Sequence, residues 1–118
     1  MTDNERTLYV EAIELWGAEA QVNMLHEEIG ELLVAMNKLW REPKNGINRS
    51  EWLRSTLEEI EDVRIMLDQM VVLLNSTDGV QGATRDLKNA RLRERLAKER
   101  ADREKRDAWK TALMGARR

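Results

Sequence analysis

Two short acidic segments repeat one another and supply the residue types that could do chemistry. The first reads Glu-Glu-Ile-Gly-Glu-Leu over residues 27–32, and the second reads Glu-Glu-Ile-Glu-Asp-Val over residues 58–63. In each segment, carboxylates three residues apart lie on one face of a helix. The two pairs are Glu28 with Glu31 and Glu59 with Asp62.

The two pairs stand in the same register to the apolar residues around them. Each carboxylate precedes an apolar residue of a heptad seam, which runs Val22, Leu25, Ile29, Leu32, Met36, Leu39 in one helix and Leu53, Thr56, Ile60, Val63, Leu67, Met70, Leu74 in the other. If the helices pack seam to seam, the four carboxylates converge and repel unless a cation sits among them. Oxygen ligands suit a hard cation, magnesium or manganese.

Two other interpretations of the acidic pairs need weighing. The pairs could be a solvated flank beside a coiled-coil seam. However, Glu27, Glu58 and Glu61 add further acid with few basic residues nearby, whereas a flank built for solubility alternates in sign. A di-iron bundle needs Glu-x-x-His on two helices, and the only histidine, His26, follows Asn23 at that spacing. We assign His26 a structural or surface role.

Composition predicts one all-α domain of modest core. The chain has 118 residues, no cysteine, no phenylalanine and one proline. Without an 18-residue apolar run or a signal-like start, we expect no membrane span and a cytoplasmic protein. Residues 1–84 carry 16 acidic and 7 basic residues, whereas residues 85–118 carry 6 and 13. The basic part could therefore meet an anionic ligand, the acidic part or nucleic acid.

Breaker residues divide the chain into four predicted helices. Their ranges are about 4–16, 18–41, 48–75 and 80 to at least 96, with Gly17 and the loop 42–46 as interruptions. We place the helical domain at residues 1–96 and a charged helical extension at residues 97–118. The third helix is apolar on several sides near its C-terminal end, which predicts a homodimer or homotetramer.

The order of these motifs resembles a known enzyme superfamily. Over about residues 8–96, the stretch 16–21 followed by the two acidic segments is similar to the MazG-like all-α nucleoside triphosphate pyrophosphohydrolases, which are related to the dimeric dUTPases. The resemblance implies a four-helix-bundle-type fold in which the matching carboxylates, Glu28, Glu31, Glu59 and Asp62, bind magnesium. It also implies cleavage of a nucleoside triphosphate between the α- and β-phosphates, giving a nucleoside monophosphate and pyrophosphate.

The same comparison suggests roles for other residues. Glu27 or Glu58 would orient the attacking water, or else be merely solvated. Phosphates would meet Lys88 and Arg91 of the fourth helix, with Lys38 behind them, or these cations would lie on a solvated face. Trp16 would stack on a base and Gln21 would hydrogen-bond it; the alternatives are core packing and an exposed polar role. Met24 and His26 stand where relatives often carry a basic residue.

A second class of function stays open at this point. The chain could be a non-catalytic helical oligomerisation module whose basic tail binds a partner or nucleic acid. Nucleic-acid binders combine a basic surface with stacking or base-reading residues. The tail has mixed charges and Trp109 as its one aromatic residue, so we expect a nucleotide substrate and no nucleic acid.

Overall fold

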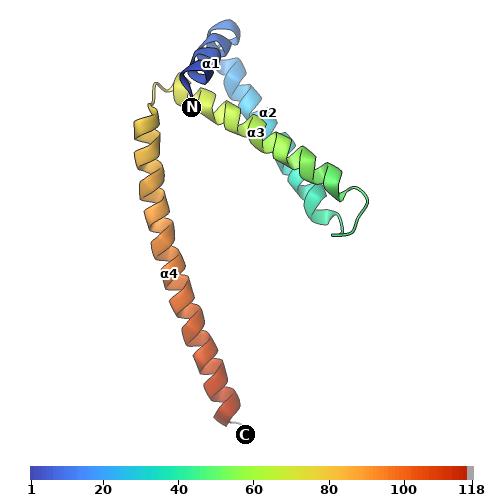
Figure 1. The fold of residues 1–118 in the computed structure, drawn as a ribbon, viewed down its shortest axis with the longest axis vertical. Coiled ribbons are helices and arrows are strands. Elements are labelled where there is room, and N and C mark those ends of the chain that lie inside the picture. Colours follow the sequence, from blue (N-terminus) through green and yellow to red (C-terminus); the bar gives the residue numbers. More distant parts are fainter. Residues whose placement is uncertain (117–118) are drawn as a thin grey trace. The chain divides into compact units, whose positions relative to one another are not determined.

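The protein is all-helical, as predicted. The computed structural model describes residues 1–116, which form four helices and no strand: α1 (Asp3–Trp16), α2 (Ala18–Arg41), α3 (Arg49–Leu73) and α4 (Asp78–Ala116) (Figure 1). They fall into two units, α1 to α3 within residues 1–77 and α4 beyond. Residue 96, the predicted end of the helical domain, lies inside α4. A MazG-like bundle stays a prediction.

Local signals account for the helix boundaries in the first unit. At the start of α1, the Glu5 backbone N–H donates to Thr2 Oγ1 at 3.1 Å, and the Thr2 N–H donates back to Glu5 Oε2 at 2.8 Å. Gly17 separates α1 from α2 at φ +88°, which side-chain-bearing residues rarely adopt. Asn48 occupies the N-cap position of α3, although its side chain makes no capping hydrogen bond.

The helices α2 and α3 run side by side and antiparallel, and they form the main contact of the first unit (Figure 1). Buried and half-buried residues recur at alternating spacings of four and three: Gln21, Leu25, Glu28, Leu32, Ala35, Leu39 on α2 and Trp52, Thr56, Glu59, Val63, Met66, Met70 on α3. These residues are the true seam. It contains Glu28 and Glu59 themselves, not only their apolar neighbours.

The predicted seam was right for alternate positions, since the contact includes Leu25, Leu32, Leu39, Thr56, Val63 and Met70, and it was wrong for several residues between them. Ile29, Met36, Leu53 and Leu67 were expected in the contact, but 38–48% of each is exposed. Each helix has apolar residues on two adjacent faces, so periodicity alone did not choose between them. The chosen face carries the small buried residues Ala35 and Thr56, which let the helix axes approach closely.

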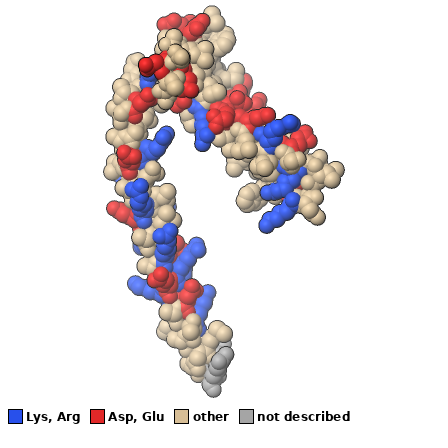
Figure 2. All heavy atoms as spheres, viewed as in Figure 1, with Lys and Arg blue, Asp and Glu red and all other residues tan. Residues whose placement is uncertain are grey.

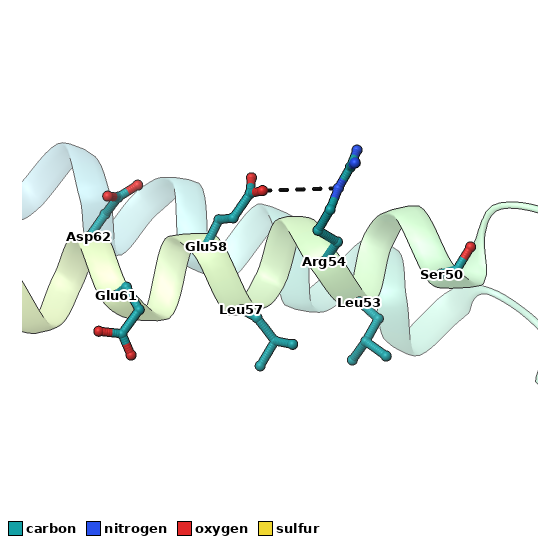
Figure 3. Close-up of a pocket in the computed structure, with 7 residues that line it drawn as sticks. All are labelled: Ser50, Leu53, Arg54, Leu57, Glu58, Glu61 and Asp62. Carbon is teal, nitrogen blue, oxygen red and sulfur yellow. Dashed lines mark ion pairs between the residues drawn. The ribbon is translucent and has the colours of Figure 1, made fainter.

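The unused apolar face of α3 forms an open hollow of about 540 Å³. It is lined by Ser50, Leu53, Arg54, Leu57, Glu58, Glu61 and Asp62, all on this one helix (Figure 3). Leu57 is exposed beside Leu53. An apolar stripe with no cover favours self-association.

We therefore expect a dimer or a dimer of dimers at micromolar concentration. Replacing Leu53 and Leu57 together with Glu should shift the chain toward monomer, because charge on the stripe opposes burial. Light scattering measures the change. Leu92→Glu, at a similarly exposed leucine of α4, is the matched control and should leave the mass unchanged. A wild-type chain that stays monomeric would contradict the prediction.

The helix α4 is long, charged and without a buried residue among its described positions 78–116. Glu99 accepts hydrogen bonds from Arg103 at 3.0 Å and from Arg106 at 3.2 Å. These two bonds hold the pKa of Glu99 below its ordinary value. Figure 2 shows acidic side chains gathered over the first unit and Lys and Arg spread along α4. None of the described helices combines the length and apolarity needed to cross a bilayer.

Removal of the residues after 96, in the second unit, should leave the first unit folded. A chain ending at residue 96 should keep its cooperative thermal unfolding, since the residues removed contribute few apolar side chains to any core. Circular dichroism should show helicity per residue close to that of the full chain. Loss of cooperativity would instead mean that residues beyond 96, such as Trp109 or Leu113, stabilise the first unit.

Candidate functional site

Carboxylates from two helices meet at the middle of the α2–α3 seam. Oxygen atoms of Glu28, on α2, and of Glu59 and Asp62, on α3, all lie within 4.8 Å of one another. Glu31 is close enough to raise the pKa of both Glu28 and Glu59. The structure thus brings three of the four carboxylates singled out from the sequence within 4.8 Å of one another, and it places the exposed Glu31 beside them. We call these four residues the carboxylate cluster.

Two oxygens of this cluster are sealed from solvent. Oε2 of Glu28 and Oε2 of Glu59 are buried and have no hydrogen-bond partner. Their burial follows from their positions, since both residues occupy the helix contact itself. A buried acceptor left without a partner is costly, and more so when it is charged. Protonation or a bound cation would remove this cost.

The pKa values of two members of the carboxylate cluster, Glu28 and Glu59, are raised by burial and by their acidic neighbours. Burial raises the pKa of Glu28 most, followed by the negative charges of Glu31, Asp62 and Glu59. Burial also comes first for Glu59, whose pKa is raised further by the negative charges of Glu31 and Asp62. Crowded carboxylates of this kind hold protons above their usual range.

A divalent hard cation fits the donor set. All the available donors are carboxylate oxygens, which suit Mg²⁺ or Mn²⁺ and not a softer metal. Oε2 of Glu28 and Oε2 of Glu59 make no hydrogen bond and are therefore available as ligands. His26 is exposed and adds no donor to this group.

On one side of the cluster lies a cavity of about 560 Å³, the Lys38 hollow. It is lined by Glu27, Gly30, Glu31, Val34, Ala35, Lys38, Trp52, Ser55 and Glu59. Lys38 Nζ lies 4.6 Å from the centre of the Trp52 ring, a cation–π contact. Two predicted residues, Lys38 and Glu27, thus share a cavity with two carboxylates. Sequence reasoning missed Trp52, although it lies two helical turns before Glu59 on the same face.

A second cavity of about 400 Å³, the Gln69 hollow, is formed by α1, α2 and α3. It is lined by Trp16, Ala20, Gln21, Met24, Met66 and Gln69. Both glutamines are buried, with 5% and 6% exposed, and Gln69 Oε1 has no hydrogen-bond partner. Trp16 is 64% exposed, so it does not pack in the core. Gln69 was missed, though its position in an apolar stretch of α3 marks it as unusual.

The remaining predicted residues lie elsewhere. Glu58 shares the outer hollow of α3 with Asp62, and its Oε1 lies 3.9 Å from Nε of Arg54 (Figure 3). Lys88 and Arg91 are exposed on α4, in the second unit. Their contact with phosphates stays a prediction.

No family model, curated protein or solved structure matches the chain. The resemblance to MazG-like enzymes therefore depends on the motifs described above.

Without metal, stability should fall as pH rises. Glu28 and Glu59 have raised pKa values in the fold, so the folded state binds more protons than the unfolded state just above the ordinary value of 4.5. Their contribution is fully present below that pH and is lost as pH rises through the raised values. Thermal unfolding in a chelator, measured from pH 4 to 8, should show this loss.

A double variant in which both glutamates become uncharged tests whether Glu28 and Glu59 cause this pH dependence. Glu28→Gln combined with Glu59→Gln should flatten the pH dependence in this window. Glu11→Gln with Glu19→Gln, at exposed positions outside the cluster, is the control and should not flatten it. A wild-type melting temperature that rises through the same window would show that the cluster does not carry this effect.

Proposed function

We propose that the protein is a magnesium-dependent nucleoside triphosphate pyrophosphohydrolase of the MazG-like kind. It would cleave between the α- and β-phosphates and release a nucleoside monophosphate and pyrophosphate. The main support is the pair of buried, unpartnered oxygens, Oε2 of Glu28 and of Glu59, in a group of three carboxylates whose oxygens lie within 4.8 Å of one another, with Glu31 beside them. Protonation or a divalent cation relieves the repulsion in such a cluster, and carboxylate oxygens suit Mg²⁺.

The residues of the chain divide the chemistry among them. The carboxylate cluster would hold the cation, which supplies charge neutralisation and polarises phosphoryl oxygens. Lys38 carries an ammonium group into the cavity beside the cluster, where it would neutralise phosphate charge. Glu27 lines the same cavity and is our first candidate to orient water and accept its proton as the phosphoanhydride bond breaks. Glu58 is the second, since it shares a hollow with Asp62 but lies beside Arg54.

Substitution of the cluster tests this function. Glu59→Gln and Asp62→Asn should each lower monophosphate release more than about 100-fold, because even partners one step removed from a metal cost 10–100-fold. Neither should unfold the chain, and each should raise metal-free stability by relieving repulsion. Wild-type protein should gain about 2.7 kcal/mol when magnesium exceeds its Kd 100-fold, and the variants should lose most of that gain.

The matched control is Glu61→Gln. Glu61 is adjacent to Asp62 in the sequence, but its Oε1 lies 2.6 Å from a guanidinium nitrogen of Arg64 on the exposed surface. Its replacement should therefore change activity and stability little. Melting curves with and without magnesium and pyrophosphate release from a panel of nucleoside triphosphates provide the readouts. Wild-type turnover by the cluster variants, or an unchanged magnesium-dependent melting shift, would reduce the carboxylates to a solvated flank.

The exposed α4 supports a second candidate, a module that binds nucleic acid or a protein partner through its basic tail. Its described residues are all unburied, and Lys and Arg dominate it (Figure 2). DNA binding would weaken steeply with added salt. Absence of such binding, together with pyrophosphate release, would favour the enzyme.

A further inference from the structure

We infer that a nucleotide lies along the α2–α3 groove in one direction, with its base in the Gln69 hollow and its outer phosphates in the Lys38 hollow. In this arrangement the carboxamide of Gln69 is a base-recognising group. The inference rests on the proposed function, because it concerns how the same site takes its substrate.

The two hollows lie on opposite sides of the carboxylate cluster. On α2, Gln21 precedes Glu28 by seven residues and Lys38 follows it by ten. At 1.5 Å per residue, these separations are about 10 Å and 15 Å along the helix. Because α3 is antiparallel, Gln69 lies at the Gln21 end and Trp52 at the Lys38 end. A chain of phosphates held at the cluster can therefore extend into either hollow.

Charge sets the direction. The Lys38 hollow contains one ammonium group beside three carboxylates, Glu27, Glu31 and Glu59, and the proposed cation would neutralise the two that belong to the carboxylate cluster. No residue that lines the Gln69 hollow is charged. Anionic phosphates gain from the cation, and they would lose hydration without compensation among Met24, Met66 and Trp16. A planar base has the opposite preference, because the exposed Trp16 ring offers a stacking face. Flexible methionines adapt to the shape of such a ring.

Gln69 supplies the recognition. Its side chain lines the hollow, it is buried, and its Oε1 has no donor within the described chain. The terminal torsion of a glutamine is broad, so a small turn brings the carboxamide toward an incoming group. The amide then accepts from an N–H and can donate to a neighbouring acceptor. The matching ligand is a nucleobase that presents an N–H at its edge.

The two products, a nucleoside monophosphate and pyrophosphate, each correspond to one half of the proposed substrate, and their separate binding tests this arrangement. Isothermal titration calorimetry measures the affinity of the 118-residue chain for each of these half-ligands in the presence of magnesium. Gln69→Met, which keeps the side-chain volume, should weaken the monophosphate at least about tenfold and leave pyrophosphate within about twofold. Lys38→Met should do the reverse. Lys44→Met, in the exposed loop before α3, is the control and should change neither.

Other results of these measurements would contradict the inferred arrangement without contradicting the proposed activity. If Gln69→Met weakened only pyrophosphate and Lys38→Met weakened only the monophosphate, the inferred direction of the nucleotide would be wrong, while the proposed activity would stand. If Gln69→Met kept both the wild-type turnover and the wild-type affinity for the monophosphate, Gln69 would not be a base-recognising residue. If Gln69→Met unfolds, Trp16→Ala at an exposed position replaces it and should weaken the monophosphate alone.

Two remaining results concern other occupants and the function itself. If a second copy of the chain fills the Gln69 hollow, Gln69→Met would shift the oligomeric state and not the monophosphate affinity, which would overturn this inference. Failure of wild-type protein to bind either half-ligand in magnesium, with no turnover, would instead contradict the proposed function.

Discussion

Two half-buried carboxyl groups in a helix contact, those of Glu28 and Glu59, are the constraint on which the first unit depends. Glu28 and Glu59 occupy positions that an ordinary seam would give to leucine, and each leaves one oxygen sealed without a partner. The contact therefore gains less from burial than an apolar seam would. Its stability depends on whether those oxygens are neutralised, by protonation or by the cation that we propose.

The rest of the unit is arranged around this contact. Ala35 and Thr56 keep the helices close, so the carboxylates of α2 and α3 reach the same point. The larger apolar side chains, such as Leu53 and Leu57, are left on an outer face. A short chain buries only a modest core, so cover from a second copy would supply apolar burial that the polar seam lacks. If the chain self-associates as we expect, one choice of helix face determines both the site and the assembly.

Sequence reasoning found the elements and the carboxylates for clear reasons. Gly17 and the loop around Pro43 are strong breakers, and carboxylates three residues apart must share a helical face. It misplaced part of the seam because α2 and α3 are apolar on two adjacent faces, and only three-dimensional packing selects one. Trp52 and Gln69 were missed for a related reason: each gains its meaning from a neighbour on another helix, which periodicity within one helix does not reveal.

The acidic positions in the seam also specify how α2 and α3 align. Sliding α3 by one heptad along α2 would preserve the spacing of apolar residues but would set Glu28 and Glu59 apart, each alone among apolar side chains. A lone buried charge costs far more than a shared one that a single cation neutralises. With the proposed cation bound, misaligned pairings would therefore be penalised by isolated charge. The carboxylates would then select the alignment of the helices, as a single buried polar residue selects one alignment in a coiled coil.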